Sequence, residues 1–112
     1  MITQDGFVHN LVAVVPEVAE TVRGHLDDQE GELLIHLLIA DLLRLTVRVF
    51  GDGREDVARR LLEFIDRCLS EGDEYVRNAV SVSFVEHYGF GSDEPEALLS
   101  LWPAGLRADL GR

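Results

Sequence analysis

The chain has 112 residues, of which 46% are hydrophobic and 28% charged, and this length and composition are typical of one globular domain with its own core. The 21 acidic residues outnumber the 10 basic ones, so the formal net charge is −11. This charge argues against nucleic-acid binding, which needs a basic surface, and favours a basic protein partner.

Two helices are predicted near the start of the chain. Residues 7–15 are apolar, and the segment VPEVAETVRGHL (residues 15–26) is expected to form a second helix or a kinked continuation of the first. Pro16 suits the first position of that helix, because its missing N–H has no helical partner there. The segment HLDDQEG (residues 25–31) is predicted to be a polar, acidic connection.

Residues 32–50 are expected to form a long central helix, because apolar side chains point in most directions around it. Asp41, Arg44 and Arg48 share one narrow stripe of this helix. The stripe is either the solvent-facing seam of a core helix or a polar groove that grips a partner. His36 lies about 140° from Asp41 on the helical wheel, so the two cannot pair on one face, and we expect His36 to be structural.

The segment 54–71 has the clearest amphipathic pattern of the chain. Its polar face carries three acid–arginine pairs four residues apart, which stabilise a helix: Glu55–Arg59, Asp56–Arg60 and Glu63–Arg67. The predicted apolar arc consists of Val57, Ala58, Leu61, Leu62, Phe64, Ile65, Cys68 and Leu69.

Gly72 is expected to end that helix and Asp73 to cap the next, over residues 74–88. A short helix is predicted over residues 92–102, stopped by Pro103 and Gly105. Residues 103–112 are then one more turn or a frayed tail.

The pattern as a whole predicts an all-α fold: residues 1–112 form a single helical domain, a compact bundle of five or six helices. Segment 57–88 resembles one helical hairpin of the HEAT type, in the run of Gly72, Asp73, Val76, Arg77 and Ala79. A solenoid needs several stacked copies, and residues 1–50 show no clear second one.

The sequence offers little for catalysis. Ser83 and His87 lie four residues apart and could form a nucleophile and base, but no glycine-rich oxyanion segment or orienting acid accompanies them. The four histidines are scattered and Cys68 is the single cysteine, so we predict no metal site, no cofactor and no disulfide.

The location expected from the sequence is cytoplasmic. The first ten residues lack the basic and apolar regions of a secretory signal, and the lone cysteine suits a reducing compartment. The longest apolar run, residues 33–50, contains four ionisable side chains, so it is not expected to span a membrane.

Acidic residues gather at or just before the predicted starts of helices, where helix dipoles explain many of them. Dipoles do not explain the overall charge of −11, which favours an acidic face for a basic partner. The single tryptophan beside Pro103 is either a lid on the core or an exposed interface anchor. The predicted partner-binding residues are Asp27, Asp28, Glu30, Asp73, Glu74, Asp93, Glu94 and Trp102.

Residues 7–90 resemble a family of small uncharacterised bacterial proteins. The resemblance is carried by a Pro-Glu start, an acidic linker, a Leu-Leu-x-His…Asp helix and a later Asp-x-x-Val-Arg-Asn…Ser-Phe-Val-Glu helix. In this chain those positions are Pro16, Glu17, Glu32, Leu33, Leu34, His36, Asp41, Asp73, Val76, Arg77, Asn78, Ser83, Phe84, Val85 and Glu86. Such proteins are similar to the small acidic immunity partners of bacterial toxin systems, so the resemblance implies binding and supplies no catalytic residue. Ile35 departs from the proline associated with the position before His36.

The leading hypothesis is therefore a non-enzymatic binding protein, of the immunity type, whose acidic surface occludes a basic toxin or effector. The alternative is a small HEAT-like scaffold or regulatory module that uses the seam of Asp41, Arg44 and Arg48. A third reading is a small hydrolase that uses Ser83 and His87.

Overall fold

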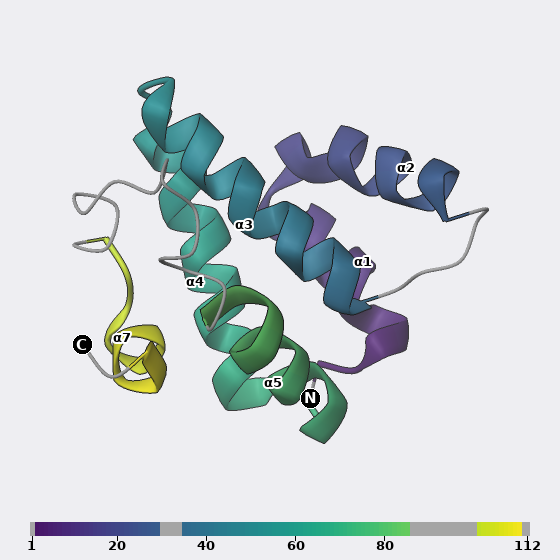
Figure 1. Cartoon of the computed structure of the whole chain (residues 1–112), viewed down its shortest axis with the longest axis vertical. Helices are drawn as coiled ribbons and strands as arrows, with labels where there is room; N and C mark the ends of the chain where they lie inside the picture. Colours follow the sequence, from purple (N-terminus) through teal and green to yellow (C-terminus); the bar gives the residue numbers. More distant parts are fainter. Residues whose placement is uncertain (1, 30–34, 86–100, 111–112) are drawn as a thin grey trace.

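Helix α3 (Ile35–Gly51) runs through the middle of the structure and contacts helices on several sides (Figure 1). The computed structural model describes residues 2–29, 35–85 and 101–110. The other elements in those residues are α1 (Gln4–Val14), η1 (Pro16–Val18), α2 (Ala19–Asp28), α4 (Glu55–Glu71), α5 (Glu74–Val80), η2 (Ser81–Val85) and α7 (Ala104–Leu110). The predicted all-α bundle of five or six helices is confirmed, and no strand occurs in the part of the chain that the structure describes.

Helix α3 is central because it is apolar around most of its circumference. It packs against α2, α4, α5 and the π-helical segment η2, and these contacts bury its side chains. The buried residues of α3 are Ile35, Leu38, Ile39, Leu42, Leu43, Leu45, Thr46 and Val49. The predicted central helix is thus confirmed over the residues described.

The first two helices meet at a corner around Pro16. Helix α1 begins at Gln4, earlier than the predicted residue 7, because the Thr3 hydroxyl accepts a hydrogen bond from the Gly6 N–H (3.3 Å) and caps the helix. Pro16 then opens the 3₁₀ turn η1, which leads into α2. Residues 25 and 26 are helical, as the predicted second helix has them, whereas the acidic connection predicted over residues 25–31 is wrong for residues 27 and 28, which extend α2 beyond the buried His25.

Helix α4 follows its amphipathic pattern closely. All the residues of the predicted apolar arc are buried except Leu69, which is half-buried. On the polar face, Glu55 pairs with Arg59 (3.5 Å) and Asp56 with Arg60 (3.6 Å), as predicted. The third pair differs, because Arg67 contacts Glu71 (2.9 Å).

Two backbone hydrogen bonds join the N-terminal segment to the junction between α4 and α5. The Ile2 N–H donates to the Glu71 carbonyl (2.8 Å), and the Ile2 carbonyl accepts from the Asp73 N–H (2.9 Å). Gly72 lies between these two bonds, with its backbone extended and against the last turn of α4. As predicted, Gly72 ends α4 and Asp73 caps α5, since the Asp73 carboxylate accepts from the Val76 N–H (2.9 Å).

The C-terminal half departs from the predicted helices in two places. The helix expected over residues 74–88 has α geometry only in α5 and widens into a π helix in η2, while residues 86–88 lie outside the described residues. Residues 104–110 form helix α7 beside α4, in place of a frayed tail, and the Asp66 carboxylate accepts its Leu106 N–H (3.1 Å). Gly105 therefore lies inside a helix and stops none. The helix predicted over residues 92–102 falls mostly outside the described residues; 101 and 102 form a turn and a bend.

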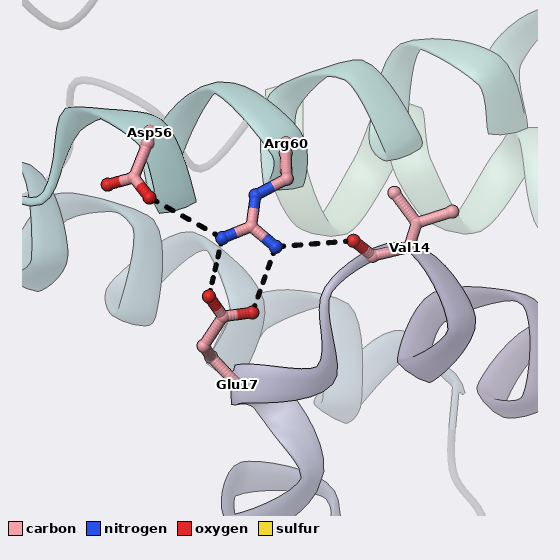
Figure 2. Close-up of polar contacts among 4 residues, drawn as sticks. All are labelled: Val14, Glu17, Asp56 and Arg60. Carbon is pink, nitrogen blue, oxygen red and sulfur yellow. Dashed lines mark hydrogen bonds and ion pairs between the residues drawn. The ribbon is translucent and has the colours of Figure 1, made fainter.

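Arg60 joins η1 to α4 (Figure 2). Its guanidinium makes two hydrogen bonds to the Glu17 carboxylate, approaches Asp56, and donates to the Val14 carbonyl (3.4 Å). This bidentate contact lowers the pKa of Glu17 below its usual range, chiefly through the Arg60 hydrogen bonds. Arg60, which lies 43 residues after Glu17 in the sequence, therefore holds the end of α1 at Val14 and the following turn against α4.

None of the helices formed by the described residues is both long enough and apolar enough to cross a bilayer.

We expect Gly72→Ala to destabilise the fold by about 1–3 kcal/mol in urea unfolding, through overpacking. A Cβ at residue 72 would lie 2.4 Å from the Cys68 carbonyl oxygen and 2.9 Å from a Val76 methyl carbon. Gly24→Ala is the matched control, since nothing lies within 4 Å of its Cβ position inside α2. That change should stabilise by about 0.5–1 kcal/mol. Equal effects of the two substitutions would contradict the packing described for Gly72.

The Arg60–Glu17 contact predicts an acid-sensitive share of stability. Because the folded-state pKa of Glu17 is lowered, its contribution is present above the unfolded pKa and lost as pH falls through the folded value. Wild type should therefore lose more stability than Glu17→Gln between pH 5 and pH 3, as measured by urea unfolding. Glu20→Gln, at an exposed acid one turn on, is the control and should track wild type. Parallel curves for Glu17→Gln and wild type would refute this role.

Candidate functional site

The described members of the predicted acidic surface lie at two places. Asp27 and Asp28 are the last two residues of α2, and both are exposed. Glu74 is exposed in the first turn of α5, whereas Asp73 is half-buried and caps that helix. Glu30, Asp93 and Glu94 lie outside the described residues.

Trp102 lies in the core. Its side chain packs against Phe84 of η2, with ring centroids 5.6 Å apart, and the residue is only 4% exposed. Of the two placements that the sequence left open, the structure shows the lid on the core. The burial of Trp102 argues against its use as an exposed interface anchor, and its partner-binding role stays a prediction.

Most arginines that the structure describes on α3 and α4 are already engaged by acids of the same chain. Arg44 pairs with Asp41 and Arg59 with Glu55, while Arg60 and Arg67 bind acids as described above. In contrast, Asp27, Asp28 and Glu74 have no cation within ion-pair distance among the described residues. Asp27, Asp28 and Glu74 are thus among the exposed acids without an ion pair in the described residues, and the others are Asp5, Glu20, Asp52 and Glu63.

The position of Asp27 and Asp28 is unfavourable for the helix that carries them. The C-terminal end of a helix bears partial negative charge, so carboxylates there are destabilising and cations stabilising. Glu74, by contrast, lies at a helix start, where an acid is favourable. Fold stability therefore explains Glu74 in part, but it does not explain Asp27 and Asp28.

The predicted seam of α3 is largely closed by its own partners. The Asp41 carboxylate binds Arg44 on one side and lies 3.7 Å from the ring of buried His25 on the other. His25 comes from α2, and the sequence carries no spacing signal for this contact because the two residues are 16 apart. Asp41 thus lies at the edge of the contact between α2 and α3, and it pairs with the exposed Arg44.

Arg48, the third seam residue, is exposed and lines a hollow of about 210 Å³ between α2 and the end of α3. The hollow carries charges of both signs, with Glu20, Asp52 and Arg54 among its other lining residues. These opposite charges do not converge on one kind of ligand, so the hollow defines no site.

Ser83 pairs with His36, and His87, the base suggested by the sequence, lies outside the described residues. The Ser83 hydroxyl lies 3.1 Å from the His36 Nδ1, and this bond joins η2 to the first turn of α3. The ring of His36 in turn contacts Tyr75 edge-on, with centroids 5.6 Å apart and planes at 82°. Ser83 is only 5% exposed, so its hydroxyl is placed to hold the histidine ring and is poorly placed to attack a substrate.

Cys68 and the metal-binding side chains offer no further chemistry in this part of the chain. Cys68 is buried, and its burial raises the pKa of the thiol to about 12, far above the value of a reactive cysteine. Among the described residues, no group of three or more histidine, cysteine, aspartate or glutamate side chains could hold a metal ion.

Comparison with known proteins places the chain in a family. The family model described as "Domain of unknown function (DUF7674)" matches residues 8–110, and the chain belongs to that family. No curated protein and no solved structure matches the chain significantly.

We expect Cys68 to be unreactive in the folded protein. With a pKa of about 12, only about one thiol in 10⁴ is ionised at pH 8, and the side chain is also buried. Ellman's reagent at pH 8 should label native protein at the rate of unfolding, and label it fully in concentrated urea. A cysteine introduced by Glu63→Cys at an exposed position of α4 is the control and should react within seconds to minutes. Fast labelling of native Cys68 would contradict the packing described.

Proposed function

We propose that this protein is a non-enzymatic binding protein of the immunity type, which occludes a basic toxin or effector through an acidic surface. The described carboxylates that would contact the partner lie at two places: Asp27 and Asp28 at the end of α2, and Glu74 at the start of α5. The proposal places the protein with its partner inside the cell.

One observation carries the proposal: two exposed carboxylates lie at the helix end that disfavours them, and neither forms an ion pair with a described residue. Residues that cost stability without a structural return are typical of functional surfaces. A basic partner would supply the missing counter-charge and would relieve the repulsion with the helix dipole.

Uncompensated charge of one sign also suits the kinetics of neutralisation. An acidic patch attracts a basic partner over several ångströms and raises the association rate, and salt weakens this attraction. An inhibitor that must reach its target quickly gains most from this effect.

The first experiment is affinity capture from a lysate of the cells that make the protein, with elution along a salt gradient and identification by mass spectrometry. The proposal expects one basic protein that leaves the column as salt rises. When that protein is expressed alone it should be harmful to cells, and co-expression of this chain should relieve the harm. A partner that is neutral and indifferent to salt would overturn the proposal.

Charge reversal separates binding from folding. We expect Asp27→Lys/Asp28→Lys to weaken binding of the captured partner by about tenfold or more and to flatten its salt dependence, since two close charge pairs are lost. The same change should raise stability in urea unfolding by about 0.3–1 kcal/mol per site, because lysine suits the end of a helix.

The matched control is Asp52→Lys/Glu63→Lys, which changes the net charge equally at exposed positions on the turn after α3 and on α4. It should reduce affinity far less. Equal losses of affinity for the two double variants would show that the net charge of the protein, and not the carboxylates at the end of α2, determines binding.

A further inference from the structure

Tyr75 is an exposed aromatic side chain that is nevertheless held in place. It is 45% exposed in the first turn of α5, and its ring rests edge-on against His36 of α3. His36 is itself fixed by the Ser83 hydroxyl of η2 at 3.1 Å. Three elements thus orient one ring that faces solvent, and a ring fixed in advance loses little entropy when a partner binds.

The surface around this ring is hollowed and acidic. A shallow hollow of about 500 Å³ is lined by Tyr75 together with Asp73, Glu74 and Asn78. One oxygen of the Asp73 carboxylate caps α5 by accepting the Val76 N–H, and the Glu74 carboxylate forms no ion pair with a described residue, although Arg77 lies one turn on in the same helix. The hollow therefore offers an aromatic face, a carboxylate that is free to pair and an amide oxygen.

Exposed apolar side chains also occur on two of the elements that pack against α5. Leu37 of α3 is 48% exposed and Val82 of η2 is 38% exposed, and α3, α5 and η2 all contact one another. Figure 1 shows α5 and η2 packed beside α3, with the outer side of α5 uncovered by the other labelled helices. The hollow itself combines the exposed ring of Tyr75 with acidic and amide groups, and an aromatic residue among polar ones is common in protein interfaces.

We propose that the hollow on α5 receives an arginine side chain of a basic partner, with the guanidinium stacked on Tyr75 and hydrogen-bonded to Glu74. The inference rests on the proposed function, whose partner is basic, and names the contact that would hold it. Arginine fits better than lysine because its planar guanidinium both stacks on an aromatic ring and pairs with a carboxylate in a fork. His36 and Ser83 act as positioning residues that orient the ring.

The test uses fluorescein-labelled nona-arginine and nona-lysine peptides, with binding followed by fluorescence anisotropy at about 50 mM salt, where charge contacts are weakly screened. Wild type should bind nona-arginine several-fold more tightly than nona-lysine. Tyr75→Leu should weaken nona-arginine binding by about three- to fivefold and nona-lysine binding by less than about twofold. Tyr75→Phe, which keeps the ring, should stay within about twofold of wild type.

Two further variants test the carboxylate and the positioning residues. Glu74→Gln should weaken nona-arginine binding about threefold, whereas Glu63→Gln, the same charge change on α4, should not. Ser83→Ala should lower the arginine preference while the circular dichroism spectrum stays native, because His36 then loses its hydrogen bond and Tyr75 its fixed orientation.

Three results would overturn the inference. In the first, Glu74→Gln and Glu63→Gln lower peptide affinity equally and Tyr75→Leu does not change it. In the second, the wild-type protein binds neither peptide. In the third, the wild-type protein binds no peptide but forms a dimer, and Tyr75→Leu dissociates this dimer. The first would assign binding to overall charge, and the last would assign the face to a second copy of the chain. The captured partner keeps the two proposals distinct. If it is basic and depends on Asp27 and Asp28 but not on Tyr75, only the arginine site fails.

Discussion

The arrangement of the other helices depends on the need to bury the apolar surface of α3. A 17-residue helix with eight buried positions cannot be screened from water by one neighbour, so α2, α4, α5 and η2 all pack around it. Helices α2, α4 and α5 turn apolar residues toward the core and keep their acids and arginines exposed or half-buried, while η2 contains no charged residue. The charge of the chain is therefore concentrated on a thin outer layer, where some arginines are paired and some acids are not.

The few polar groups on α3 determine which element covers which part of it. Asp41 meets buried His25 from α2, and His36 meets Ser83 from η2. Thr46 is buried as well, and its hydroxyl donates to the Leu42 carbonyl of the same helix (2.7 Å). Buried polar groups are costly when unpaired, so each cross-helix pair favours one packing arrangement over others that bury the same apolar area.

The features that the sequence predicted well are local ones. The apolar arc of residues 54–71 and the cap at Asp73 depend on neighbours within one or two turns, and their periodicity or spacing is visible directly. The pair of His36 and Ser83 spans 47 residues, and it depends on how α3 and η2 cross, which no spacing rule contains. Trp102 was ambiguous for the same reason, because an aromatic residue near a proline suits a core and an interface equally well until its neighbours are known.

Unpaired charge and the oriented ring act on different properties of a complex. Long-range attraction by Asp27, Asp28 and Glu74 sets how often a basic partner arrives, but it weakens with salt and gives little preference for one basic surface over another. A ring held by a histidine and a serine acts only at contact distance, so it affects how long the partner stays and which side chain it presents. On the proposals made for this protein, the end of α2 governs association and the outer face of α5 governs selectivity. The part-buried hydrogen bond between His36 and Ser83 then has a second consequence, because the same contact joins η2 to α3 and holds the histidine against the exposed ring of Tyr75.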